Sequence, residues 1–331
     1  MGVNVLIFAN QIRPKDNWLG LLRISIAAEI VDKVTLVGAT DGEFLEQEKV
    51  IYKKAVDIRE IMNHRLVFGL PSKYTHLKLI NLFSGKAIFL GVVPGKVTKA
   101  LGSFQGATNR FAKKTLIFAK SLLPYNYTLA QDFEDAMYLS AAFGQDIGSY
   151  LPIGLPKNVY IASEFLKDSG VRDIGILFVP THRWDGNVSI VAEWLGDKDF
   201  VTAMKKFNVY YNNHPNEEER AVIHESVIDT KTLSGSLWGN IDILVTDYSS
   251  IAHDYLAAGG KNVIHIIPDL KDFEEHEGKS PLTYESQFPG VEIHTKIEFL
   301  EFLENITDFK RDTINVTEYS NVWIGKILSH K

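Results

Sequence analysis

The sequence predicts an α/β protein with two domains, each built on a parallel β-sheet that helices cover on both faces. Three observations lead to this fold class. The chain has 331 residues, which is more than one domain usually holds. Its first elements follow a strand–helix–strand order, the unit of a parallel sheet. Continuous apolar segments then alternate with helical segments, a pattern typical of strands buried on both faces.

The amino-terminal half opens on a strand at Val3–Ala9, a helix, and a second strand at Lys33–Val37 that Gly38 closes. Asp16 or Asn17 is the expected N-cap of the helix. Its apolar face has helical spacing and consists of Trp18, Leu21, Leu22, Ile26 and Ile30.

The alternation is clearest in the carboxyl-terminal half. Strands are predicted at 174–180, 208–215, 241–247 and 262–268. Helices are predicted over 188–205, from Glu217, and over 249–260, where a Gly-Gly pair closes the last one. We place the domains at 1–155 and 156–331, and we expect the last helix to pack back on the first domain.

Composition excludes several classes of protein and site. There is no cysteine, so disulfide scaffolds, Cys-ligated zinc sites and thiol catalysis are ruled out. No HExxH motif is present, and we expect no metal and no cofactor. Neither GxGxxG nor a P-loop occurs. We find no signal peptide and no apolar run long enough to span a membrane, which predicts a cytoplasmic protein.

The net charge of −6 hides a segregation of charge. Residues 61–131 carry ten basic and no acidic residues, and the remainder carries 25 basic against 41 acidic residues, a net of −16. The basic residues of this segment are Arg65, Lys73, Lys78, Lys86, Lys96, Lys99, Arg110, Lys113, Lys114 and Lys120. Such a block predicts a surface that meets an anionic polymer or the inner face of the plasma membrane, rather than nucleic acid.

A helix predicted over residues 110–123 carries part of this charge. Phe and Leu residues share the helix with Arg110, Lys113, Lys114 and Lys120, so it could lie in a membrane interface as a peripheral anchor. A helix packed on the core with solvated lysines explains the same pattern equally well.

Polar residues follow three of the predicted strands, at the edge where open parallel sheets bind ligands. The sequence TDYSS spans Thr246 to Ser250, PTHR spans Pro180 to Arg183, and NNHP ends in His214 and Pro215. Serine hydroxyls at a helix start, together with the free N–H groups there, suit a phosphate or diphosphate. Arginine suits phosphate oxygens, and His214 could act as an acid or base.

Each of these motifs also has a purely structural explanation. Ser249 could simply cap the following helix, Arg183 could lie in a solvated loop, and His214 could be an ordinary surface histidine. The agreement of three strand ends favours a phosphate-binding site.

The motifs together resemble the CDP-glycerol/CDP-ribitol glycerophosphotransferases of teichoic acid and capsule synthesis. Six segments match in family order over roughly residues 133–328. They are AAFGQD…YLPIGLPKN (141–158), ILFVPTHR (176–183), NNHP (212–215), IDILVTDYSSIAHDYLAAG (241–259), IIPDLKDFEEHEG (266–278) and PGVEIHTKIEFLEFL (289–303). The resemblance implies a glycosyltransferase-B fold, in which two Rossmann-like domains face a cleft.

The resemblance also implies roles for individual residues. Ser249 and Ser250 would bind the donor's diphosphate, and Thr246 and Asp247 would line the nucleotide pocket. Arg183 would lie near the diphosphate, with Pro180, Thr181 and His182 beside it, and His214 at the reacting centre. Gln105 stands where the family has the histidine thought to activate the acceptor, and glutamine cannot take a proton at neutral pH.

The implied reaction transfers glycerol or ribitol phosphate from a cytidine diphosphate donor to a hydroxyl of a lipid-linked saccharide or polymer, releasing CMP. One alternative is a CMP-sugar glycosyltransferase of the sialyl or Kdo type, with Asp132, Glu134 or Asp135 as the base. A second is a non-catalytic protein that binds anionic polymers.

Overall fold

The computed structural model divides the chain into two compact units. Unit 1 comprises residues 1–96, 107–161 and 314–331, and unit 2 comprises 97–106 and 162–313. The structure describes residues 2–12, 15–38, 48–69, 87–93, 95–96, 125–143, 145–166, 173–181, 188–213, 222–230, 237–277, 279–280, 282–306, 312 and 314–330.

The described part of unit 1 holds a seven-stranded sheet with the order β3-β2-β1-β4-β5-β6-β7, in which every pair is parallel. The strands are β1 (Val3–Phe8), β2 (Val31–Val37), β3 (Val50–Lys53), β4 (Leu66–Phe68), β5 (Ile88–Val92), β6 (Tyr127–Ala130) and β7 (Tyr150–Pro152). The helices are α1 (Lys15–Ala27), α2 (Ile58–Met62), α5 (Phe133–Phe143) and α13 (Val316–Ser329), with 3₁₀ turns at Ala9–Gln11 and Ile147–Ser149. Helix α6 (Pro156–Phe165) begins in unit 1 and ends in unit 2.

The burial of strand β1 on both faces explains why its sequence is continuously apolar. Val5 and Ile7 pack into one buried cluster, and Leu6 and Phe8 pack into another. Because side chains of a strand alternate between the faces of a sheet, both faces of β1 are covered and both need apolar residues.

Helix α1 already includes Lys15, Asp16 and Asn17. The prediction that Asp16 or Asn17 is its N-cap is therefore wrong. Asn17 is fully buried and tethers neighbouring segments instead, because its Nδ2 donates to the carbonyl of Val93 at 3.2 Å.

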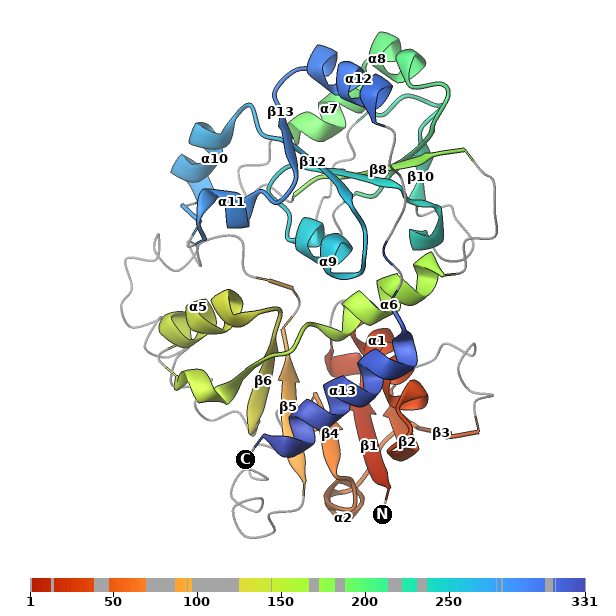
Figure 1. Ribbon diagram of the computed structural model, residues 1–331, viewed down its shortest axis with the longest axis vertical. Coiled ribbons are helices and arrows are strands. Elements are labelled where there is room, and N and C mark those ends of the chain that lie inside the picture. The colour runs from red at the N-terminus through yellow and green to blue at the C-terminus, as the bar shows by residue number, and fades with distance from the viewer. Residues whose placement is uncertain are drawn as a thin grey trace. The chain divides into compact units, whose positions relative to one another are not determined.

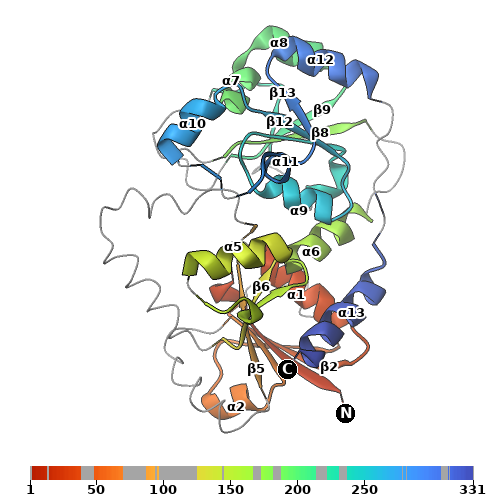
Figure 2. The same ribbon diagram turned by 60° about the vertical axis from the view of Figure 1, so that its left-hand side comes forward.

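The carboxyl-terminal helix α13 belongs to unit 1, where it lies along α1 (Figure 1, and from another side Figure 2). Trp323 of α13 is buried, stacks on Phe68 at a centroid distance of 5.9 Å, and donates from Nε1 to the Gly154 carbonyl at 3.4 Å. The end of the chain is therefore part of the core of this unit.

The described part of unit 2 holds a six-stranded parallel sheet with the order β10-β9-β8-β11-β12-β13. Its strands are β8 (Gly175–Val179), β9 (Asn208–Tyr211), β10 (Ile228–Asp229), β11 (Ile243–Thr246), β12 (Asn262–Ile266) and β13 (Val291–Ile293). Its helices are α7 (Ile190–Gly196), α8 (Lys198–Ala203), α9 (Ile251–Ala257), α10 (Leu270–Glu277), α11 (Tyr284–Gln287) and α12 (Lys296–Asn305), with a 3₁₀ turn at Trp238–Asn240.

The two parallel sheets confirm the predicted fold class. The predicted strands are present, with β2 beginning two residues earlier than predicted and the others lying within the predicted bounds. The helix predicted over 188–205 is instead two helices. Asp197 interrupts it, since its carboxylate accepts from the backbone N–H groups of Asp199 and Phe200 at 2.9 and 3.2 Å and so caps α8.

Replacing Trp323 with alanine should lower the free energy of unfolding by about 3–5 kcal/mol, because it empties a buried aromatic site. Chemical unfolding of the purified chain measures this. The neighbouring exposed Val322 is the control, and Val322→Ala should change the free energy by less than about 0.5 kcal/mol. Equal effects of the two variants would contradict the assigned packing of α13.

Candidate functional site

The sheet of unit 2 has a topological switch point between β8 and β11. From β8 the chain proceeds outward to β9 and β10, and it then returns to the other side of β8 to form β11, β12 and β13. In open α/β sheets ligands bind beyond the carboxyl ends of the strands at such a point. The segments that follow β8 and β11 begin with Pro180 and Asp247, so the predicted PTHR and TDYSS motifs start at this switch point.

A buried carboxylate joins the segments at the switch point. Asp247 is 0% exposed, and its Oδ1 accepts from the backbone N–H groups of Thr181 and Tyr248 at 2.8 and 2.7 Å. Its Oδ2 accepts from the hydroxyl of Ser189, the N-cap of α7, at 2.8 Å. One side chain thus fixes the start of the loop after β8, the loop after β11 and the start of α7.

Thr246 and Asp247 were expected to line a nucleotide pocket, but both side chains are buried within the unit. The Thr246 hydroxyl donates to the carbonyl of Val179 at 2.6 Å, which ties the ends of β11 and β8 together. These hydrogen bonds give both residues a structural role, and their expected part in a nucleotide pocket stays a prediction.

His265 supports the same loop from β12. Its Nδ1–H donates to the carbonyl of Asp247 at 2.8 Å. Burial lowers the pKa of His265, and the contact with Asp247 only partly offsets this. The imidazole is therefore buried under the loop, where its neutral form is favoured.

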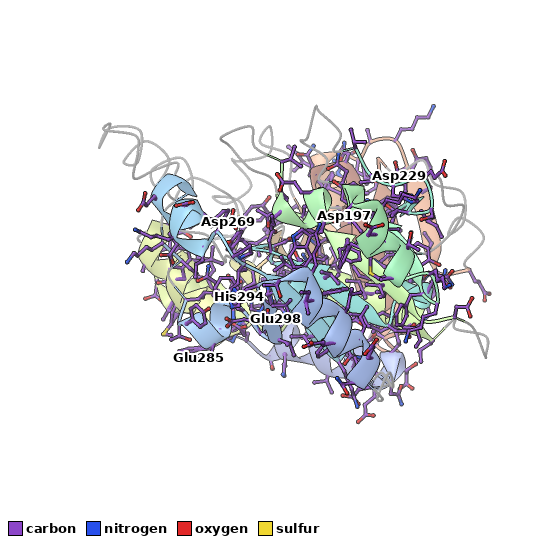
Figure 3. All side chains as sticks on the ribbon, turned by 90° about the horizontal axis from the view of Figure 1, so that it is seen from above. Asp197, Asp229, Asp269, Glu285, His294 and Glu298 are labelled. Carbon is purple, nitrogen blue, oxygen red and sulfur yellow. The ribbon has the colours of Figure 1, made fainter. Side chains whose placement is uncertain are left out.

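Tyr248 anchors the loop on its other side. Its ring stacks on Phe273 of α10 with a centroid distance of 3.7 Å and an interplanar angle of 11°. Its hydroxyl donates to Asp269 at 2.8 Å, and Figure 3 labels Asp269 next to α10. Tyr248 lies in the TDYSS motif and both of its partners lie in the matched segment 266–278, but no sequence pattern predicts the contact between the two segments.

Ser249 and Ser250 are half-buried and follow this anchored segment. Ser249 Oγ accepts from the Ile251 N–H at 3.4 Å, a long hydrogen bond that is only weak capping. Ser250 occupies the N-cap position of α9 with no capping bond from its side chain. Simple capping therefore does not account for both hydroxyls.

Two further buried side chains at this edge each have one polar atom without a hydrogen-bond partner. Thr181 is 4% exposed and its Oγ1 has no partner; Asn213 is 5% exposed and its Nδ2 has none. The Asn213 Oδ1 accepts from the Tyr211 hydroxyl at 3.2 Å. An unpaired buried donor costs about 1–3 kcal/mol, so such groups call for an explanation. Asn213 lies in the NNHP motif, but nothing in the sequence distinguishes it as more important than its neighbour His214.

Several predicted residues lie outside the described part of the chain. They are Gln105, Arg110, Lys113, Lys114, Lys120, His182, Arg183 and His214. Their roles remain predictions.

In unit 1 the alternative bases are the carboxylates of Asp132, Glu134 and Asp135. All three form ion pairs or hydrogen bonds within the unit. Lys96 is buried and forms ion pairs with Asp132 at 2.8 Å and Glu134 at 2.9 Å. Burial alone would lower the pKa of Lys96, but these hydrogen bonds outweigh it and raise the pKa. Asp135 is fully buried and accepts from the Gln131 N–H at 2.9 Å. Lys96 therefore presents no uncompensated positive charge to an anionic partner.

The described residues hold neither a metal-binding cluster nor a membrane-spanning helix. No group of three or more histidine and acidic side chains is placed to hold a metal ion there. No helix within the described ranges is long and apolar enough to cross a membrane.

Comparison with known proteins matches the chain to a protein family. The model of the CDP-glycerol:poly(glycerophosphate) glycerophosphotransferase family matches residues 72–321. No curated protein matches the sequence.

Solved structures share the fold. The wall teichoic acid polymerase TagF is 15% identical with a TM-score of 0.62, over 99% of this chain and 83% of that chain. A TagF variant soaked with CDPG is 13% identical with a TM-score of 0.61, over 99% and 84%. The UDP-GlcNAc 2-epimerase of Methanocaldococcus jannaschii is 13% identical with a TM-score of 0.51, over 100% of each chain. The fold is of the glycosyltransferase-B type.

Asp247→Ala should lower the free energy of unfolding by at least about 2 kcal/mol, because three buried donors lose their acceptor. Chemical unfolding measures the loss. Asp199→Ala, at an exposed position of α8, is the control and should stay within about 0.5 kcal/mol of the parent. A tolerated Asp247→Ala would show that this carboxylate does not hold the loops together.

Stability should fall as the pH drops below about 6.5, since the folded chain binds protons at His265 less readily than the unfolded chain does. For each proton that the unfolded chain binds and the folded chain does not, the free energy of unfolding changes by about 1.4 kcal/mol per pH unit. His265→Gln should flatten the profile between pH 7.5 and 5.5 in unfolding titrations, whereas His330→Gln at an exposed site should not. Parallel profiles for the parent and His265→Gln would refute the assignment.

Proposed function

Because the chain belongs to the CDP-glycerol:poly(glycerophosphate) glycerophosphotransferase family, we propose that it transfers glycerol phosphate or ribitol phosphate from a cytidine diphosphate donor to an acceptor hydroxyl. The proposed acceptor is a lipid-linked saccharide or a cell-surface polymer such as a teichoic acid. The family match over residues 72–321 is the observation that carries the proposal. The switch point in unit 2 supports it, because hydroxyl donors follow the strand that ends there.

The proposed step is a displacement at phosphorus. The acceptor oxygen attacks the β-phosphorus of the donor, the new P–O bond forms, and the anhydride bond to the α-phosphate breaks. CMP leaves with the electron pair, and the acceptor proton passes to a base. The donor is a substrate, so the reaction needs no separate cofactor.

In this proposal the loop after β11 meets the diphosphate. Asp247, Tyr248 and His265 hold the loop still, so that Ser249 and Ser250 can donate without reorganising. Arg183 and His214 are proposed to stabilise the charge on the departing CMP, and Gln105 to orient the acceptor rather than take its proton.

The acceptor side is proposed to use the basic segment of residues 61–131. Arg110, Lys113, Lys114 and Lys120 would face an anionic polymer or the inner surface of the plasma membrane as a peripheral contact. Each basic residue near such a surface contributes about 1 kcal/mol to binding.

A CMP-sugar transferase with a carboxylate base is the second candidate. The observation that favours it is the pair of carboxylates of Asp132 and Glu134 after β6, which Lys96 holds together through ion pairs of 2.8 and 2.9 Å.

Release of CMP from CDP-glycerol, CDP-ribitol and CMP-sialic acid, measured with a lipid-linked acceptor, separates these functions. We expect release from CDP-glycerol or CDP-ribitol and none above background from CMP-sialic acid. Ser250→Ala should reduce the rate at low donor concentration about 10–100-fold, the effect of one hydrogen bond to a charged group.

Ser329→Ala, at an exposed position near the end of α13, is the matched control and should keep the parent rate. Release of CMP from CMP-sialic acid alone would show that the donor is a CMP-sugar and not a CDP-activated polyol phosphate. Tight polymer binding with no turnover of any donor would favour a non-catalytic role.

A further inference from the structure

A polar and aromatic surface lies at the carboxyl edge of the sheet of unit 1, the kind of edge at which open α/β sheets bind ligands. It is made by Lys96, which follows β5, and by Asp132, Phe133 and Glu134, which follow β6. We infer that this surface binds an uncharged saccharide ring of the acceptor, and so selects a neutral lipid-linked saccharide over a polymer of glycerol phosphate. The inference rests on the proposed function and narrows its acceptor.

The buried Lys96 holds two carboxylates together. Only 5% of its side chain is exposed, and its ammonium group donates to Asp132 Oδ2 at 2.8 Å and to Glu134 Oε2 at 2.9 Å. Asp132 Oδ1 also accepts from the backbone N–H of Asp135 at 2.9 Å, which ties this carboxylate to the first turn of α5. Because both carboxylates are fixed before a ligand arrives, they lose little conformational freedom when one binds.

The two carboxylates stay accessible although Lys96 bonds to them. The exposed fraction of the side chain is 45% for Asp132 and 33% for Glu134. A carboxylate accepts several hydrogen bonds, so each group can accept from a ligand hydroxyl in addition to the ammonium group. One positive charge against two negative charges leaves Lys96, Asp132 and Glu134 with a net charge of −1. The group therefore attracts hydroxyl donors and repels the phosphates of an anionic polymer.

Phe133 lies between the two carboxylates in the sequence, and 60% of its surface is exposed. An exposed aromatic ring in the same segment as fixed hydrogen-bond acceptors offers the two kinds of contact that a sugar makes. The C–H groups of a sugar face pack on the ring, and the hydroxyls around it donate to the carboxylates. A glycerol phosphate chain has no ring face to pack, and each of its units carries a negative charge.

The basic segment of residues 61–131 does not offset this charge at the described part of the edge. Its described basic residues are Arg65 and Lys96. Arg65 directly precedes β4 and so lies at the opposite, amino edge of the parallel sheet. Lys96 is at the carboxyl edge, but its ion pairs with Asp132 and Glu134 take up its charge. The described groups at this edge thus suit a neutral ligand.

A comparison of acceptors with the full chain tests the inference. Release of CMP from CDP-glycerol and CDP-ribitol is measured with two sets of acceptors that carry the same octyl chain. One set consists of glycosides of neutral disaccharides, and the other of oligomers of glycerol phosphate. We expect kcat/KM to be at least about tenfold higher for the best neutral glycoside than for any of the oligomers.

Two substitutions separate the effect of the ring from that of the charge. Phe133→Ala should raise the KM for the neutral glycoside about tenfold, since the ring contact is lost, and should leave the KM for the donor within about twofold. Glu134→Gln keeps the size of the side chain and removes its charge, so it should raise kcat/KM for the oligomers about three- to tenfold but not for the glycoside. Met137→Ala, at an exposed position one turn along α5, is the matched control and should keep the parental values.

Three results would overturn the inference and leave the proposed function in place. They are a parent that uses the oligomers at least as well as every neutral glycoside, a parental KM for the glycoside in Phe133→Ala, and a loss in Phe133→Ala that is equal for the donor and both sets of acceptors. A parent that releases no CMP from either donor with any of these acceptors would instead contradict the proposed function.

Discussion

The buried carboxylate of Asp247 is the interaction on which the candidate site depends. A charged group with no exposure is tolerated only when donors surround it, and here two backbone N–H groups and the Ser189 hydroxyl do so. Those donors come from three separate segments of unit 2. Satisfying one charge therefore sets the relative positions of the loop after β8, the loop after β11 and helix α7.

Other residues of unit 2 hold the same loops in place. Thr246 ties the end of β11 to β8, and His265 donates from β12 to the backbone of Asp247. Tyr248 carries the loop onto Phe273 of α10. With the loop fixed at these points, the remaining polar groups at the edge have their geometry already set, which is what the proposed reaction at phosphorus would require.

The sequence predicts the fold well because each central strand is buried on both faces and so reads as a continuous apolar run. It also predicts a candidate site, since polar residues after β8, β9 and β11 must share one edge of a parallel sheet. It does not reveal which polar residues bind and which support. Asp247 accepts a hydrogen bond from Ser189, which lies 58 positions away in the sequence, and no local sequence pattern predicts that contact. The same holds for Asn213, whose orientation comes from Tyr211, and for Asp197, whose side chain divides a helix that the periodicity makes continuous.

Hydrogen–deuterium exchange of the full chain with and without CDP tests the central claim most directly, namely that the donor binds at the switch point of unit 2. The account predicts added protection in peptides that span residues 177–181 and 246–252. It predicts no change in β1 (Val3–Phe8), which lies in the core of unit 1. Saturating CDP that leaves both unit 2 segments unprotected, while protecting segments of unit 1, would contradict it.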